Sequence, residues 1–295
     1  MNVRESPSQL IVGLGQIRPR LGDVDANLDR HLELITEARA QGVDLLIFPE
    51  LSLTGYFLKD LVPVVSRPAD TSDPVLGRLA EESRDMDLVV GFIERDRRHR
   101  FYVAAAYLSA GHIVHVHRKL YLPTYSMFDE GRYLAAGKDI RSFATRFGGV
   151  GLLICEDFWH ISPPYLLWLD GADLMIHLSS SPGRGLSRAE GGRLASMRFV
   201  EDLNRVYAAV FTTFVIHVNR VGFEDGVNFW GGSLCIGPDG DVLVQAPYFE
   251  EALVKAQLDL AELRRVRSRL PLLRDERPEL TMRILQRILN RPEAC

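Results

Sequence analysis

The chain has 295 residues, 46% of them hydrophobic and 25% charged, which is the composition of an ordinary globular protein without low-complexity stretches. Its 35 basic and 39 acidic residues give a formal net charge of -4, too small to favour nucleic acid or an anionic membrane as a partner. The sequence shows no apolar signal segment and no membrane-spanning run, so we expect a cytoplasmic protein that acts on a small molecule. Three cysteines, Cys155, Cys235 and Cys295, are too few and too scattered for a disulfide framework or a zinc site.

Short apolar segments bounded by turn residues recur along the chain and predict buried strands. They lie at residues 10–17, 43–49, 87–94, 101–108, 150–157, 173–179 and 214–219. Helical patterns cover residues 27–40, followed by Gly42 in a C-cap position, and residues 188–208. Tight turns around Gly111 and at residues 238–240 predict hairpins, and therefore antiparallel pairs within a mixed sheet. The strand–helix–strand order indicates a layered α/β fold.

No Gly/Ser-rich or Pro-rich linker divides the chain, so we expect one domain over residues 8–262. Residues 263–295 then form a C-terminal tail, in which residues 264–290 end in a short amphipathic helical pattern. We expect this tail to pack on the domain or on a partner subunit.

Several other patterns resemble functional motifs but are incomplete. Residues 13–18 lack the third glycine of a dinucleotide-binding loop, and Pro19 follows where a helix should begin. His115 and His117 share one face of a strand without a third metal ligand, so we interpret them as solvent-side residues of a half-exposed hairpin. The basic run 95–100 is interpreted as a solvated hairpin tip, and residues 231–235 fail the serine-hydrolase pattern. We therefore expect no cofactor and no metal.

Three polar residues stand at the points where apolar strands end. Glu50 follows Pro49 after one strand, Cys155 follows another and precedes two acids, and Lys119 closes a hairpin strand. Carboxyl ends of strands are where open α/β sheets build their sites. Taken singly, however, a loop glutamate, a buried inert cysteine and a solvated lysine are the more common interpretations.

Together the three residues form a consistent chemical set. A thiol becomes a nucleophile when a nearby carboxylate removes its proton, and the same acid can later protonate a leaving amine. Glu50 suits that role towards Cys155. An amide carbonyl under attack develops negative charge on oxygen, which Lys119 and the backbone N–H of Glu156 could stabilise.

Residues 48–56 (FPELSLTGY), 118–137 (RKLYLPTYSMFDEGRYLAAG) and 152–159 (LLICEDFW) resemble, in order and rough spacing, the signature regions of the nitrilase superfamily of carbon-nitrogen hydrolases. Within that superfamily they look most like the glutaminase domain of glutamine-dependent NAD synthetases. The likeness extends through residues 179–185 and 219–243. It implies a four-layer αββα sandwich with mixed β-sheets, assembled as a homodimer or a larger homo-oligomer.

The resemblance also implies roles for particular residues. Glu50 would be the general base, Lys119 the cation on the oxyanion side, Cys155 the nucleophile, and Glu130 a second glutamate that positions the substrate and the catalytic groups. As an alternative, Glu130 is an ordinary loop acid. The residues expected to contact the substrate are Tyr56, Tyr125, Glu156, Trp159 and Ser181.

The substrate is less well defined by the sequence. Nitrilases usually have tryptophan after the cysteine, whereas this chain has Glu156, which favours an amide over a nitrile. Gly183 departs from the glutaminase pattern, which often has an aromatic residue there, and no S-G-G-x-D-S-type ATP loop occurs. NAD synthesis by this chain alone is therefore not expected.

Two enzymatic hypotheses follow for the substrate. We prefer an amidase for a small amide. The alternative is a glutaminase that supplies ammonia to a separate partner enzyme, with Arg184 or Arg188 binding the α-carboxylate. A non-catalytic binding protein on the same fold is a third hypothesis, against which the retention of all three polar residues argues.

Overall fold

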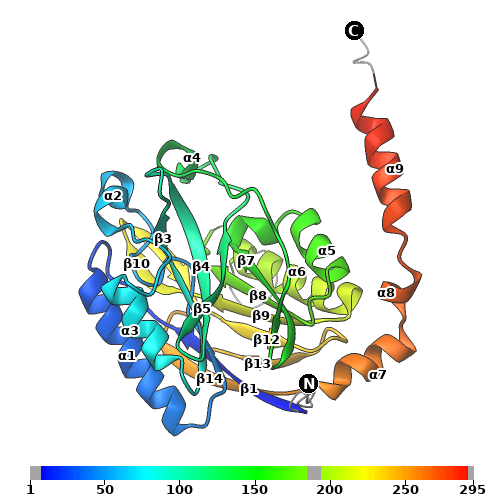
Figure 1. The fold of residues 1–295 in the computed structure, drawn as a ribbon, viewed down its shortest axis with the longest axis horizontal. Coiled ribbons are helices and arrows are strands. Elements are labelled where there is room, and N and C mark those ends of the chain that lie inside the picture. Colours follow the sequence, from blue (N-terminus) through cyan, green and yellow to red (C-terminus); the bar gives the residue numbers. More distant parts are fainter. Residues whose placement is uncertain (1–7, 185–193, 292–295) are drawn as a thin grey trace.

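The computed structural model describes residues 8–184 and 194–291, and its core is a pair of six-stranded mixed sheets (Figure 1). In the first sheet the order of strands is β14 (Ala252–Asp259), β1 (Gln9–Gln16), β2 (Leu45–Ile47), β3 (Asp87–Arg95), β4 (Phe101–Ser109) and β5 (His112–Arg118). In the second sheet the order is β13 (Val242–Gln245), β12 (Leu234–Ile236), β9 (Phe214–Asn219), β8 (Leu174–Ser179), β7 (Gly148–Ile154) and β6 (Phe143–Thr145). A separate hairpin pairs β10 (Val221–Glu224) with β11 (Val227–Trp230).

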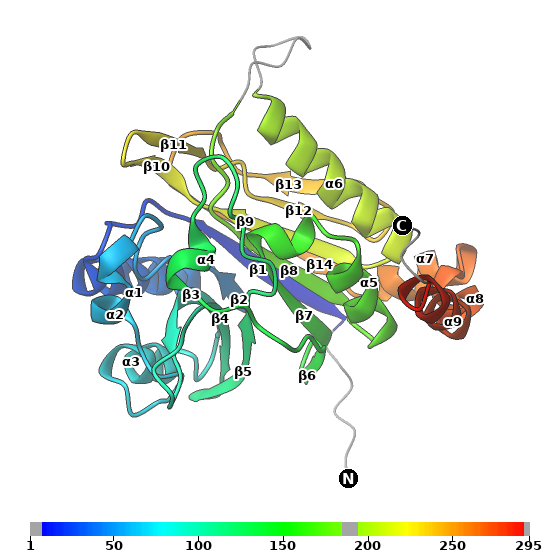
Figure 2. The ribbon, with the colours of Figure 1, turned by 90° about the horizontal axis from the view of Figure 1, so that it is seen from above.

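The helices lie on the outer faces of the two stacked sheets (Figure 2). On the first sheet they are α1 (Val24–Ala40) and α3 (Pro74–Glu82), and on the second α5 (Ser162–Leu169) and α6 (Ala195–Phe211). Short helices α2 (Val62–Val65) and α4 (Glu130–Tyr133) lie in loops, and α7 (Ala261–Arg269), α8 (Leu272–Asp275) and α9 (Pro278–Leu289) follow the last strand. This arrangement confirms the predicted four-layer αββα sandwich with mixed sheets.

The apolar alternation of the strands explains the layering. In β7, Leu152 and Ile154 belong to the core between the two sheets, whereas Leu153 packs with Trp168 and Phe211 of α5 and α6. Successive side chains of a strand point to opposite faces, and both faces of this strand are covered by apolar layers. Both faces of such a strand are apolar, which is why the predicted strands are continuous apolar runs in the sequence.

The structure corrects the bounds of several predicted elements. The expected strand 43–49 shortens to β2 at Leu45–Ile47, and the expected strand 150–157 ends at Ile154, after which Cys155–Phe158 forms a 3₁₀ helix. The predicted helix 188–208 is α6, which begins at Ala195 and continues to Phe211, and residues 188–193 lie outside the described residues. The hairpins at Gly111 and at 238–240, and the tip at 95–100, are confirmed by antiparallel pairing of the flanking strands.

The prediction for the histidines of β5 is wrong. His115 and His117 are 8% and 3% exposed, and their shared face points into the protein instead of into solvent. The reason is that β5, although an edge strand, packs against β7 of the second sheet. His115 stacks on Phe143, and His117 donates a hydrogen bond from Nε2 to Asp157.

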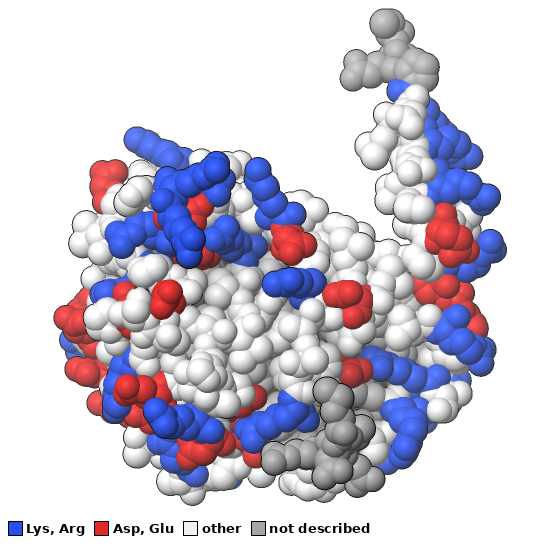
Figure 3. Space-filling view, in the orientation of Figure 1, with Lys and Arg blue, Asp and Glu red and all other residues white. Residues whose placement is uncertain are grey.

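The segment after β14 extends from the two-sheet body. Leu263 and Val266 of α7 are buried, whereas α9 has no buried residue and stands away from the sheets in Figure 1. Figure 3 shows basic side chains along one side of α9 and uncharged ones along the other, as the amphipathic pattern predicts. The division into a domain and a packing tail stays a prediction. Among the described residues, no helix is long and apolar enough to cross a membrane.

Gly91 of β3 lies against the turn that carries Glu50. A Cβ atom at Gly91 would lie 2.5 Å from both the Leu51 nitrogen and the Pro49 carbonyl oxygen. Both are backbone atoms, so the turn would have to move. We expect Gly91→Ala to lower the free energy of unfolding by about 1–3 kcal/mol, measured by urea denaturation.

Gly13→Ala is the matched control for this change in the same sheet. Its closest neighbours are side-chain carbons, the nearest being Leu46 Cδ1 at 3.0 Å, and side chains yield more readily than backbone. The control should therefore lose less stability. Equal losses in the two variants would contradict the assigned role of Gly91.

Candidate active site

Three of the four predicted catalytic residues meet around one buried ammonium group. Lys119, directly after β5, donates hydrogen bonds from Nζ to Glu50 Oε1 at 2.8 Å and to Glu130 Oε1 at 2.7 Å. Glu50 lies in the turn after β2, and Glu130 is the first residue of α4. The three residues are 0%, 1% and 7% exposed, respectively, so water does not screen these contacts.

The cluster has one cation against two carboxylates. Burial raises the pKa of Glu130, Lys119 lowers it and the nearby Glu50 raises it, and together these effects bring the pKa to about 7. For Lys119, burial disfavours the charge, but Glu130 and Glu50 more than offset it and hold the pKa well above its ordinary value. Lys119 is thus a permanent cation. Oε2 of Glu50 and Oε2 of Glu130 are buried without a hydrogen-bond partner among the described residues.

Cys155 stands beside this cluster at the start of the 3₁₀ helix. Its side chain is 5% exposed and its backbone is in the left-handed region, with φ of 46°. Leu51, next to Glu50, is also left-handed, with φ of 51°. Such conformations are unfavourable for residues other than glycine and often occur at functional turns. Both strands therefore end in sharp, strained turns at the candidate site.

The charges of the cluster act on the Cys155 thiol. Burial raises the pKa of this thiol well above its ordinary value, the negative charge of Glu50 adds to that effect, and Lys119 opposes it. The resting thiol is therefore protonated and requires a base before it can act as a nucleophile.

Cys155 lines a pocket together with most of the predicted substrate-contacting residues. The others in its lining include Tyr125, Phe128, Glu156, Trp159, Ser181 and Arg184. The Tyr125 hydroxyl donates to the Glu156 carboxylate at 2.9 Å, and Trp159 stacks on Phe199. Ser181 is buried, with Oγ 2.5 Å from Ser179 Oγ.

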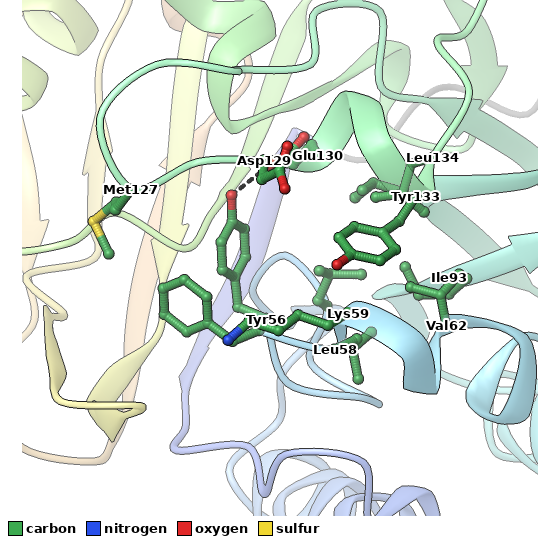
Figure 4. Close-up of a pocket in the computed structure, with 13 residues that line it drawn as sticks. Tyr56, Leu58, Lys59, Val62, Ile93, Met127, Asp129, Glu130, Tyr133 and Leu134 are labelled. Atoms are coloured by element: carbon green, nitrogen blue, oxygen red, sulfur yellow. Dashed lines mark hydrogen bonds between the residues drawn. The ribbon is translucent and has the colours of Figure 1, made fainter.

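Tyr56 occupies a different place from these residues. Its hydroxyl donates to Glu130 Oε1 at 2.5 Å, and with Glu130 it borders a second, largely apolar pocket that Cys155 does not line (Figure 4). Its backbone N–H donates to Glu224 Oε1 at 2.8 Å, which fixes the loop after the first signature segment. Tyr56 therefore contacts the carboxylate cluster and not the pocket of the thiol.

Among the described residues that line the Cys155 pocket, Arg184 is the cation. Its guanidinium lies over the Phe128 ring, 5.1 Å from the centroid, and Nη1 donates to Ser126 Oγ at 2.8 Å. Arg188, the other predicted carboxylate-binding arginine, lies outside the described residues.

Some residues that support the site were not singled out from the sequence. Ser180 donates from Oγ to the Glu50 carbonyl oxygen at 3.0 Å and so joins the second sheet to the turn of the first. The second carboxylate oxygen of Glu224 accepts a hydrogen bond from the buried Arg220 at 2.7 Å. The position of Ser180 beside Ser181 could have identified it, whereas Glu224 acts from a distant hairpin that no local pattern indicates.

The model of the carbon-nitrogen hydrolase family matches residues 11–268, and the chain therefore belongs to this family. The glutamine-dependent NAD(+) synthetase of Thermotoga maritima is 34% identical over 267 residues, which are 88% of this chain and 43% of that protein. The Acinetobacter baylyi enzyme of the same name is 32% identical over 255 residues, 86% of this chain and 45% of that protein. The chain thus spans less than half the length of these relatives.

Solved structures agree with this assignment. The glutamine-dependent NAD+ synthetase of Acinetobacter baumannii superposes with a TM-score of 0.76 at 31% identity, over 85% of this chain and 46% of that chain. A carbon-nitrogen hydrolase from Helicobacter pylori gives 0.81 at 22% identity, over 94% of this chain and 98% of that chain. An amidase from Nesterenkonia gives 0.77 at 22% identity, over 93% and 95%. The last two support the fold alone.

The raised pKa of Glu130 predicts that the free energy of unfolding depends on pH. The folded state holds this carboxyl at a pKa of about 7 against an ordinary value of 4.5, so it binds more protons than the unfolded state between these pH values. Its stabilising contribution is complete below pH 4.5 and is lost as the pH rises through 7. Glu130→Gln mimics the neutral carboxyl and does not titrate. As the pH rises through this range, its free energy of unfolding should therefore increase relative to that of the wild type, by up to about 3 kcal/mol.

Urea unfolding of both proteins at intervals from pH 4 to pH 8 measures this difference. Glu81→Gln, on the exposed side of α3, is the control and should run parallel to the wild type at all pH values. A constant difference between Glu130→Gln and the wild type would show that Glu130 does not titrate in this range.

Proposed function

We propose that this carbon-nitrogen hydrolase is a cysteine-dependent amidase that cleaves a small linear amide through a thioester. The observation that supports it most is the buried Lys119 bridging Glu50 and Glu130 beside a protonated thiol that opens on a pocket. Amide cleavage by a thiol needs a nucleophile, a base that accepts its proton and a group that stabilises the oxyanion, and Cys155, Glu50 and Lys119 suit these three roles.

In the acylation step, the free Oε2 of Glu50 accepts the proton of the Cys155 thiol as Sγ attacks the amide carbonyl carbon. Negative charge moves to the carbonyl oxygen, where the Lys119 ammonium and the Glu156 backbone N–H stabilise it. The C–N bond then breaks as Glu50 returns the proton to the nitrogen. Ammonia or an amine leaves, and the acyl group remains on Cys155 as a thioester.

In the deacylation step, Glu50 accepts a proton from a water molecule whose oxygen attacks the thioester carbonyl carbon. The second tetrahedral species collapses, the C–S bond breaks, and Cys155 regains its proton from Glu50. A carboxylic acid is released. Glu130 acts throughout by holding Lys119 and Tyr56, through the contacts at its Oε1.

The acyl group of the substrate must fit the pocket of Cys155. The tyrosine, tryptophan and serine residues of its lining, Tyr125, Trp159 and Ser181, would contact it, and Glu156 supplies the oxyanion N–H. Arg184 at the same pocket favours a substrate that carries a carboxylate, because a guanidinium binds carboxylates through paired hydrogen bonds. Glutamine is such an amide, so a glutaminase that supplies ammonia to a partner enzyme is the second candidate.

We also propose that the chain forms a homodimer or larger homo-oligomer. Helices α5 and α6 expose large apolar side chains, among them Leu166, Phe199, Val206 and Val210, each close to half exposed. Apolar stripes of this kind commonly mark protein–protein interfaces. Sedimentation equilibrium would measure the assembly, and a monomer at all concentrations would contradict it.

The central prediction concerns Cys155 and Glu50. Cys155→Ala should reduce ammonia release from any amide to the background rate while the protein stays folded. Glu50→Gln should slow acylation by about 10²–10⁴-fold, because an amide cannot accept the thiol proton. A substrate panel of glutamine, asparagine, short aliphatic amides, carbamoyl compounds and nitriles, with ammonia release and intact-mass detection of the thioester, is the measurement.

The outcomes of this experiment separate the hypotheses. Ammonia release that survives in Cys155→Ala would overturn the proposed mechanism, and rapid thioester formation in Glu50→Gln would assign the base to another residue. If the wild type forms no adduct and releases no ammonia from any compound, the chain is a non-catalytic binding protein on this fold.

A second prediction tests the carboxylate preference. Arg184→Gln should lower kcat/KM for glutamine by about 10–100-fold, the size of a lost charged hydrogen bond, and leave 4-aminobutanamide, which lacks the α-carboxylate, nearly unchanged. Arg198→Gln, on an exposed ion pair of α6, is the control. Equal effects on both amides would remove Arg184 from substrate recognition.

A further inference from the structure

The nucleophile and the cation of the proposed site come from different sheets. Lys119 follows β5, at the edge of the first sheet, and Cys155 follows β7 in the second. Apolar packing between sheets is non-directional, and does not by itself hold two side chains in one relative position. Catalytic groups require placement to a fraction of an ångström, which directional contacts between the two segments would provide.

The Asp157 carboxylate makes those contacts. Its Oδ1 accepts hydrogen bonds from the backbone N–H groups of Leu120 at 2.8 Å and Tyr121 at 3.0 Å, the two residues after Lys119. Its Oδ2 accepts from the backbone N–H of Ile154 at 3.1 Å, the residue before Cys155, and from His117 Nε2 at 2.8 Å. One carboxylate therefore binds both sides of the lysine and the strand end that leads to the cysteine.

Burial makes this arrangement rigid. Asp157 is 0% exposed and His117 is 3% exposed, so no water competes for these hydrogen bonds. A carboxylate has about four lone-pair positions, and here four N–H donors occupy them. The Lys119 backbone N–H donates to the Val103 carbonyl oxygen, and its carbonyl oxygen accepts from the Gly137 N–H. Neither hydrogen bond connects Lys119 to the segment that carries Cys155.

We propose that Asp157 and His117 form a positioning pair that sets the distance between the Lys119 ammonium and the Cys155 thiol. The inference rests on the proposed amidase function, which it deepens. Neither residue touches the reacting atoms. Asp157 fixes the backbone after Lys119 and the backbone before Cys155. His117 donates the fourth hydrogen bond to the Asp157 carboxylate and keeps it oriented.

The test uses three variants and a matched control in the full chain. Asp157→Asn replaces one acceptor oxygen with an NH₂ group, which cannot accept from Ile154. His117→Leu removes the donor, whereas His117→Gln places an NH₂ group where Nε2 lies. His115→Leu alters another buried histidine of β5 that stacks on Phe143 and does not contact Asp157.

We expect kcat per folded molecule to fall by about 10–100-fold in Asp157→Asn and His117→Leu, with KM nearly unchanged, because misplaced groups raise the barrier of the chemical step. His117→Gln should recover most of the rate, and His115→Leu should keep it. The folded fraction is taken from circular dichroism and urea unfolding, so that a loss of folding alone is corrected for.

The alkylation rate of Cys155 by iodoacetamide is measured in parallel and needs no turnover. It should fall about tenfold in Asp157→Asn and His117→Leu relative to His115→Leu. If the wild type turns over no amide, the proposed function fails while alkylation still decides the positioning role. If the wild type is active, and Asp157→Asn matches it in kcat per folded molecule and in alkylation rate, the positioning role is wrong and the proposed function stands.

Discussion

The candidate site depends on the ion pairs that the Lys119 ammonium makes with Glu50 and Glu130. A fully buried cation is unfavourable by several kcal/mol unless acceptors surround it, and here two carboxylates from distant parts of the chain do so. That requirement draws the turn after β2, the end of β5 and the start of α4 to one point. Burial, together with the negative charge of Glu50, raises the pKa of the nearby Cys155 thiol and keeps it protonated. One oxygen of each carboxylate has no hydrogen-bond partner among the described residues.

The site also depends on the stacking of two sheets. Glu50, Lys119 and Glu130 follow elements of the first sheet, whereas Cys155 and Ser181 follow strands of the second. The directional hydrogen bonds that cross between the sheets include those from Ser180 to the Glu50 carbonyl and from the segment after Lys119 to Asp157. The apolar core brings the sheets together, and these polar contacts set where their edges meet.

Sharp turns that follow strands carry Glu50 and Cys155 of the candidate site. Leu51 and Cys155 both adopt left-handed backbone conformations although neither is glycine. Such strain is tolerated where surrounding packing holds the turn, and Gly91 makes room for one of the two turns by lacking a side chain. Buried carboxylates and a strained cysteine reduce stability locally and are expected where a protein performs chemistry.

The sequence by itself determined the layered fold, the positions of its long strands along the chain and the catalytic candidates, because apolar runs and the residues that end them are local features. It did not determine the first residue of α6. It also did not determine the burial of His115 and His117, because that depends on packing of β5 against the other sheet. Only the tertiary structure placed Tyr56 on Glu130 and joined Asp157 to the segment after Lys119. Hydrogen bonds between residues far apart in the chain leave no periodic pattern. The strength of an interaction between charges depends on their distance and their burial, and only the fold sets both.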